Sequence, residues 1–136
     1  MINFKINSNI LYYFFPPAIC LLTTIFWLLS RKYDNMGYYV STFCIILNII
    51  VIPIYLIIIN FVIKDVAMGK KIIFSFSSSI TSTTIHYLNY GITTKTLFSP
   101  DYETKLILFY EFIAPCSILA VFFVIAFICN LIKSRT

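Results

Sequence analysis

The chain is built from long apolar runs that are separated by short polar segments. The run from Val40 to Ile63 contains no charged residue. A helix of that length rises about 36 Å, which is enough to cross the roughly 30 Å hydrocarbon core of a bilayer. Its many Ile and Val residues favour a strand in water, but in lipid a segment must satisfy its own backbone hydrogen bonds. We therefore predict a transmembrane helix over residues 39–63.

Two more runs predict transmembrane helices in the same way. Residues 10–30 are apolar and are followed by the basic pair Arg31-Lys32 rather than by a small-residue cleavage site, so we expect an uncleaved first span. Residues 106–132 form the last span, which ends in a short basic tail. Because the connection between the first two spans is short, we expect them to form an antiparallel hairpin.

The segment 72–92 has two interpretations. It carries no charge and is long enough to span, but about eight of its residues are Ser or Thr. It is either a transmembrane helix whose hydroxyls bond back to carbonyls one turn earlier, or a re-entrant or interfacial element. We favour the span. The predicted fold is thus all-α: a polytopic helical membrane bundle, one domain over residues 1–136, with three transmembrane helices and a fourth candidate.

Two adjacent prolines lie in the first third of the first span. A proline lacks the amide hydrogen that would bond the carbonyl four residues earlier. Pro16 and Pro17 therefore leave the carbonyls of Tyr12 and Tyr13 without helical partners. This predicts either a bend or a late start of the first helix.

Polar side chains inside the predicted spans are the candidates for recognition within the membrane. They are Asn48, Asn60, His86 and Glu111. Pro53 frees the carbonyl of Ile49, so this region is either a polar notch that faces another helix or a kink with Asn48 bonded within its own helix. A lone histidine in a Ser/Thr-rich helix is typical of a hydrogen-bonded packing residue, and we expect no ligand role for His86.

Glu111 is the most anomalous residue, because a carboxyl group inside a span costs free energy. Pro115 removes the amide that would have bonded the Glu111 carbonyl, so one site holds a carboxyl group and a free carbonyl. A polar partner would satisfy both, and His86 and Asn48 are candidates within the chain. The alternative is that Glu111 lies shallow and reaches headgroups or water.

Composition supports a membrane protein. Hydrophobic residues make up 60% of the chain and charged residues 11%, against about 25% charge in an average soluble domain. The formal net charge of +5 comes from basic residues at the ends of the apolar runs, which is typical of membrane anchors and not of a nucleic-acid surface. We therefore expect lipid, and no nucleic acid, as a partner.

The same basic residues predict an orientation. With four spans, one side of the membrane carries six of them: Lys5, Lys64, Lys70, Lys71, Lys133 and Arg135. The other side carries Arg31, Lys32, Lys95 and Lys105, accompanied by the acidic Asp101 and Glu103. The bias places both termini in the cytoplasm. With three spans, the N-terminus stays inside and the C-terminus moves outside.

No catalytic, cofactor-binding or metal-binding pattern is present in the sequence. The four cysteines, Cys20, Cys44, Cys116 and Cys129, lie singly in apolar runs, so no CxxC or metal-ligand spacing exists. We interpret them as small packing residues. There is no Gly-rich phosphate loop and no GxxxG motif. We expect a protein that is not an enzyme and that has no cofactor.

The order of these features resembles the small inner-membrane immunity proteins that protect bacteria against pore-forming colicins. The first span leads through a short charged loop into Gly37-Tyr38-Tyr39, and the second has a late Pro53 and ends in residues 60–65, NFVIKD. The last span opens with residues 105–112, KLILFYEF. The chain departs from that pattern where Val66-Ala67 replaces an aromatic pair and where residues 72–94 form an insertion.

This resemblance implies a protein that binds the pore-forming domain of a colicin in the inner membrane and blocks its channel. Recognition in lipid depends on helix packing and a few interhelical hydrogen bonds. Two alternatives stay open on the sequence alone. One is a small structural subunit of a larger membrane complex, and the other is a small transporter or channel unit.

Overall fold

The computed structural model describes residues 8–30, 36–94 and 102–136, and these are nearly all helical, without a strand. The elements are α1 (Ser8–Ser30), α2 (Met36–Ile46), the π-helical segment η1 (Leu47–Val51), α3 (Ile52–Val62), α4 (Met68–Thr94) and α5 (Tyr102–Arg135). The helices α2, η1 and α3 follow one another without a break and form one rod. The all-α prediction is confirmed for the described residues.

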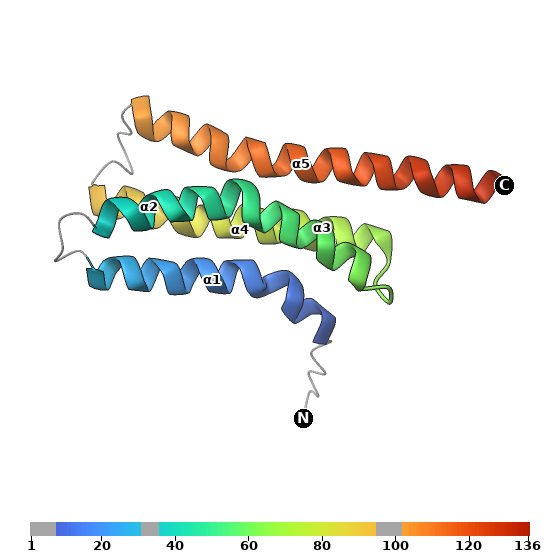
Figure 1. Ribbon diagram of the computed structural model, residues 1–136, viewed down its shortest axis with the longest axis horizontal. Coiled ribbons are helices and arrows are strands. Elements are labelled where there is room, and N and C mark those ends of the chain that lie inside the picture. The colour runs from blue at the N-terminus through green and yellow to red at the C-terminus, as the bar shows by residue number, and fades with distance from the viewer. Residues whose placement is uncertain (1–7, 31–35, 95–101) are drawn as a thin grey trace.

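The rods lie side by side and alternate in direction (Figure 1). The start of α1, the turn between α3 and α4, and the end of α5 lie at one end of the bundle. The end of α1 and the starts of α2 and α5 lie at the other end. The basic residues Lys5, Arg31, Lys32 and Lys95, on which the predicted orientation partly depends, lie outside the described residues.

Three of the described helical segments are long and apolar enough to cross a membrane. They are Asn9–Leu29, Thr42–Val62 and Lys105–Arg135. The second of them runs through α2, η1 and α3. These segments fall on the three predicted transmembrane helices, and they are what a membrane protein requires by length and composition. Most of their large apolar side chains are exposed on the outside of the bundle.

The helix α4 is not one of those three segments, because its hydroxyl-rich sequence is too polar. It is nevertheless one uninterrupted helix of 27 residues, which is about 40 Å long. It packs against α1 and α5. A continuous rod inside the bundle is the geometry expected of a span, but the crossing of the membrane by residues 72–92 stays a prediction.

The helix α4 turns its polar face inward. Its buried polar residues recur at spacings of three and four and so lie on one face: Ser75, Ser78, Ser79, Ser82, Thr83 and His86. The opposite face exposes Ile73, Ile80 and Leu88. A surface helix of a water-soluble protein has the opposite arrangement, with its apolar face toward the core and its polar face toward water. Small hydroxyl side chains let neighbouring helices approach closely, which is how helices pack in lipid.

The helix α1 bends near its first turns (Figure 1), and it does not start late. Pro16 and Pro17 are both inside the helix, and prolines inside helices are a usual cause of bends. The carbonyl of Tyr12, which Pro16 leaves without a helical partner, accepts a hydrogen bond of 2.9 Å from the hydroxyl of Tyr55 on α3. A neighbouring helix thus supplies the donor that the proline removed.

The rod formed by α2, η1 and α3 accommodates the missing amide hydrogen of Pro53 in another way. The π-helical segment η1 directly precedes this proline, which occupies the first turn of α3. A π-helix bonds each amide to the carbonyl five residues earlier, so it shifts the hydrogen-bond pattern around the missing amide. The same segment turns Leu47 and Asn48 into the interior, where both are buried. The rod therefore continues through Pro53 as an unbroken run of helical residues.

Candidate functional site

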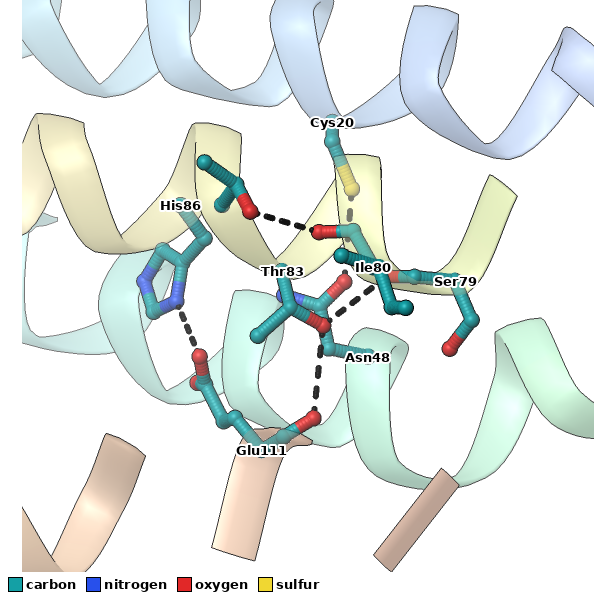
Figure 2. A network of polar contacts seen from close by, with 8 residues as sticks. Cys20, Asn48, Ser79, Ile80, Thr83, His86 and Glu111 are labelled. Carbon is teal, nitrogen blue, oxygen red and sulfur yellow. Dashed lines mark hydrogen bonds and ion pairs between the residues drawn. The ribbon is translucent and has the colours of Figure 1, made fainter. Parts of the chain in front are cut away.

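The centre of the bundle holds a polar cluster that joins four elements (Figure 2). Its strongest link connects α4 with α5: His86 Nδ1 lies 2.9 Å from Glu111 Oε2. Both side chains are buried, and Glu111 is only 1% exposed. His86 Nδ1 donates this hydrogen bond to the carboxylate when that nitrogen carries a hydrogen, and the contact is also an ion pair when both ring nitrogens are protonated. One of the two partners expected for Glu111 is therefore present, and the carboxyl group is buried against α4 rather than open to water.

The backbone carbonyl of Glu111 also has a hydrogen-bond donor on α4. The Thr83 hydroxyl has one hydrogen, which is shared between the Ser79 carbonyl at 3.0 Å and the Glu111 carbonyl at 3.3 Å, the carbonyl that Pro115 leaves without its helical partner. Figure 2 shows Thr83 between the two helices. The carboxyl group and the carbonyl of Glu111 are thus both held by α4, as the sequence required, but by His86 and Thr83 together.

Asn48 belongs to a second link, between η1 and α1. The Cys20 thiol lies 3.4 Å from Asn48 Oδ1 and donates a weak hydrogen bond to it. Asn48 is therefore a polar notch that faces a neighbouring helix, and it is not bonded within its own helix. It does not bond Glu111, so the second partner proposed for that residue is wrong.

Asn60 is the centre of a separate cluster near the turn between α3 and α4. Its Oδ1 accepts a hydrogen bond of 2.8 Å from Tyr13 on α1. Its Nδ2 donates to Ser75 on α4 at 2.9 Å and to the Leu56 carbonyl at 2.8 Å. The side chain thus uses its carbonyl and both amide hydrogens, and it ties three helices together.

Three buried polar atoms have no hydrogen-bond partner among the described residues: Asn48 Nδ2, Ser78 Oγ and Glu111 Oε1. Two of them belong to the central cluster, so its donors and acceptors are incompletely matched. An unmatched buried polar atom costs roughly 1–3 kcal/mol. The cluster therefore holds the helices in register at some expense in stability.

The described residues do not assemble a metal site, since no group of three or more His, Cys, Asp or Glu side chains is close enough to hold an ion. All four cysteines are free thiols, and they differ in exposure: Cys20 and Cys44 are buried, Cys116 is half-buried and Cys129 is exposed. The packing interpretation fits the first two. The buried thiols, the hydroxyls and the single carboxyl group act here as hydrogen-bonding and packing groups.

The four predicted recognition residues are all buried inside the bundle. The structure brings His86 and Glu111 into contact, and it places Asn48 in the same central cluster and Asn60 in the other one. Their role in recognition stays a prediction, because their side chains point to other helices of the same chain. A partner that approaches through the lipid would meet the apolar exterior first.

The sequence reasoning did not single out Thr83, Tyr13 or Ser75, which complete the two clusters. A signal for two of them was present. Thr83 and Ser75 belong to the run of hydroxyl residues at helical spacing, which places them on the face shared with His86. Tyr13 had no such signal, because an aromatic residue in a span is usual and its partner lies 47 positions away.

No protein-family model matches this sequence, and no match is found among the curated proteins or the solved structures. The fold and the candidate site are therefore defined by the residues and contacts of this chain alone. They describe an all-helical bundle with three segments apolar enough to span a membrane and with its polar groups turned inward.

Proposed function

We propose that this chain is a non-enzymatic protein of the bacterial inner membrane that protects its cell by binding a pore-forming bacteriocin within the bilayer. Binding blocks the toxin channel. The proposal rests on the resemblance of the chain to colicin immunity proteins in the order of its spans, loops and prolines. Both termini face the cytoplasm in this proposal, because the basic residues are more numerous on that side.

The observation that carries this proposal is the distribution of polar and apolar groups. The polar side chains of the spans bond to one another inside the bundle, while large apolar side chains cover the outside. Several of the exposed side chains are aromatic, such as Phe26 on α1, Phe43 on α2 and Phe61 on α3. A surface of this kind recognises another membrane helix by shape, because packing drives helix association in lipid.

The same distribution argues against a transporter. A solute or proton path needs several polar residues in line along a water-filled route. Here the described spans bury one carboxyl group, which bonds His86, and the inward face of α4 otherwise carries serine and threonine hydroxyls. A bundle that bonds its carboxyl group internally and presents an apolar exterior suits a binding protein better.

The first test is a protection assay. Sensitive cells that express the chain are challenged with a panel of pore-forming colicins, and potassium efflux is recorded. Protection against one toxin and not against the others supports the proposal. Sensitivity to the whole panel, with the protein shown to be in the membrane, refutes it and favours the structural-subunit alternative. The protein would then be purified under mild conditions to identify what stays bound.

Glu111 variants test whether the polar cluster takes part in protection. Glu111→Gln keeps an oxygen and an amide that can bond His86, so we expect normal membrane insertion with weaker protection if the carboxyl group contributes to recognition. Ser77→Gln is a matched control, because Ser77 lies on the exposed face of α4. Full protection by Glu111→Leu would show that the carboxyl group is dispensable, and that the recognising surface lies elsewhere on the bundle.

A further inference from the structure

A groove lies between the end of α3, the start of α4 and the second half of α5, with a volume of about 360 Å³. Its walls are mostly apolar and include Phe61, Met68 and Phe122, with two asparagines, Asn60 and Asn130, among the lining residues. The rings of Phe61 and Phe122 meet edge to face with centroids 5.5 Å apart. The residues that α5 contributes extend from Phe122 to Lys133, which corresponds to about 16 Å along the helix axis.

Two lysines from different helices line this apolar groove, Lys71 of α4 and Lys133 of α5. Lys71 is half-buried, and its Nζ donates to the carbonyl of Asn60 at 2.8 Å and to the carbonyl of Ile63. These bonds satisfy carbonyls at the end of α3 and hold the ammonium group in place. An ammonium group has three donors, so these two bonds leave a third N–H for another acceptor.

The charges at this end of the bundle are unbalanced. The described charged side chains on the turn, the first turn of α4 and the end of α5 are Lys64, Asp65, Lys70, Lys71, Lys133 and Arg135, which is five positive and one negative, or a net charge of +4. The N-terminus of α4 adds a positive dipole end, where further cations are unfavourable. An anion in the groove would offset this repulsion.

The position of the groove relative to the bilayer indicates which class of molecule supplies the anionic group. Apart from Asn130, the last turns of α5 stay apolar as far as Ile132, and the helix extends past the turn between α3 and α4 (Figure 1). A bilayer that covers α5 therefore places Lys71 at or below the level of the headgroups, where a basic side chain needs a negative partner. Because most of the lining is apolar, with phenylalanine and methionine among it, the partner must also have an apolar part.

We propose that this groove binds an anionic phospholipid. The phosphate lies near Lys71 and Lys133, and an acyl chain follows Phe61 and Phe122 along α5. Basic pockets between membrane helices bind acidic headgroups in this way. The proposal does not depend on the toxin-binding function, and it would hold equally for a subunit of a larger complex.

Lipid binding is measured on the purified full-length chain in detergent by native mass spectrometry, with phosphatidylglycerol compared against phosphatidylcholine. We expect clear preference for the anionic lipid. The matched variants are Lys133→Gln, which alters the groove, and Arg135→Gln, which removes an equal charge outside its lining. A basic residue near a membrane surface contributes enough for about fivefold in affinity, so Lys133→Gln should bind about fivefold more weakly and Arg135→Gln within twofold of the parent.

Cys129 provides a local readout, because it is exposed and lines the groove, whereas Cys116 does not line it. Phosphatidylglycerol should slow alkylation of Cys129 and leave Cys116 unchanged. Three results would overturn the proposal: equal binding of both lipids, equal losses in the two variants, or displacement of the lipid by millimolar inorganic phosphate alone. The last result would identify a site for free anions, and equal losses would mean diffuse attraction to the basic end of the bundle.

Discussion

The bond between His86 and Glu111 should couple α4 to α5 measurably. Replacing either residue by leucine removes the contact of 2.9 Å between His86 Nδ1 and Glu111 Oε2. Interhelical hydrogen bonds in membrane proteins contribute about 0.6 kcal/mol on average and at most about 1.7 kcal/mol. This contact belongs near the upper limit, because both side chains are buried and both are ionisable. We expect a coupling free energy of about 1.5 kcal/mol, which is roughly tenfold in the folding equilibrium.

The single variants alone do not give this value, because two effects oppose each other in Glu111→Leu. The substitution removes the bond, but it also removes a carboxyl group near the start of a span, whose insertion costs less than the roughly 2.5–3.5 kcal/mol of a charged side chain at the centre of a span. The coupling is therefore taken from a double-mutant cycle of the parent, His86→Leu, Glu111→Leu and the double variant, in which the insertion terms cancel.

Unfolding in mixed micelles is titrated with sodium dodecyl sulfate and followed by the fluorescence of Trp27, the single tryptophan of the chain, which is buried beside Cys44. Tyr13→Phe combined with Glu111→Leu is the control pair, because Tyr13 bonds Asn60 and not Glu111. That pair should be additive within about 0.5 kcal/mol. A coupling below that value for His86 and Glu111 would refute the reasoning that this bond holds the two helices together.

Three further predictions address packing, the proline sites and the number of spans. Ser78→Leu should destabilise the bundle by about 1–3 kcal/mol, because Ser78 is fully buried on the packed face of α4, whereas Ser77→Leu on the exposed face should leave the unfolding midpoint unchanged. Equal midpoints for the two variants would contradict the inward polar face. Tyr55→Phe removes the donor to the Tyr12 carbonyl and should cost about 0.6 kcal/mol in the same titration, and no change at all would show that the proline-freed carbonyl does not need this partner. Reporter enzymes fused before Met1 and after Thr136 should report the same side of the membrane if α4 is a span, and opposite sides would establish three spans.

The helical segments could be predicted from the sequence because they follow from the length of the apolar runs. A run such as 40–63 has few options in lipid other than a helix, since no water is present to bond the backbone. The prolines were informative for the same reason. Each one frees a known carbonyl, so the need for a donor near Tyr12 and Glu111 was evident from the chain alone.

The partners that meet these needs could not be predicted. Tyr55 is 43 positions away from Tyr12, and Thr83 is 28 positions away from Glu111. Asn48 was an equally reasonable partner for Glu111, but the π-helical segment η1 and the packing against α1 direct it to Cys20. Such choices depend on helix rotation and register, and these emerge only when all the helices pack together.

The helical character of the chain, the places of its apolar segments and the backbone groups that need an external donor all follow from the order of its residues. Local length, hydropathy and proline chemistry are enough for that. The burial of the hydroxyl face of α4, the sharing of Glu111 between His86 and Thr83, and the presence of Lys71 and Lys133 in one groove emerge only in the packed bundle. These features join residues far apart in the chain, so they depend on how whole helices are oriented against one another.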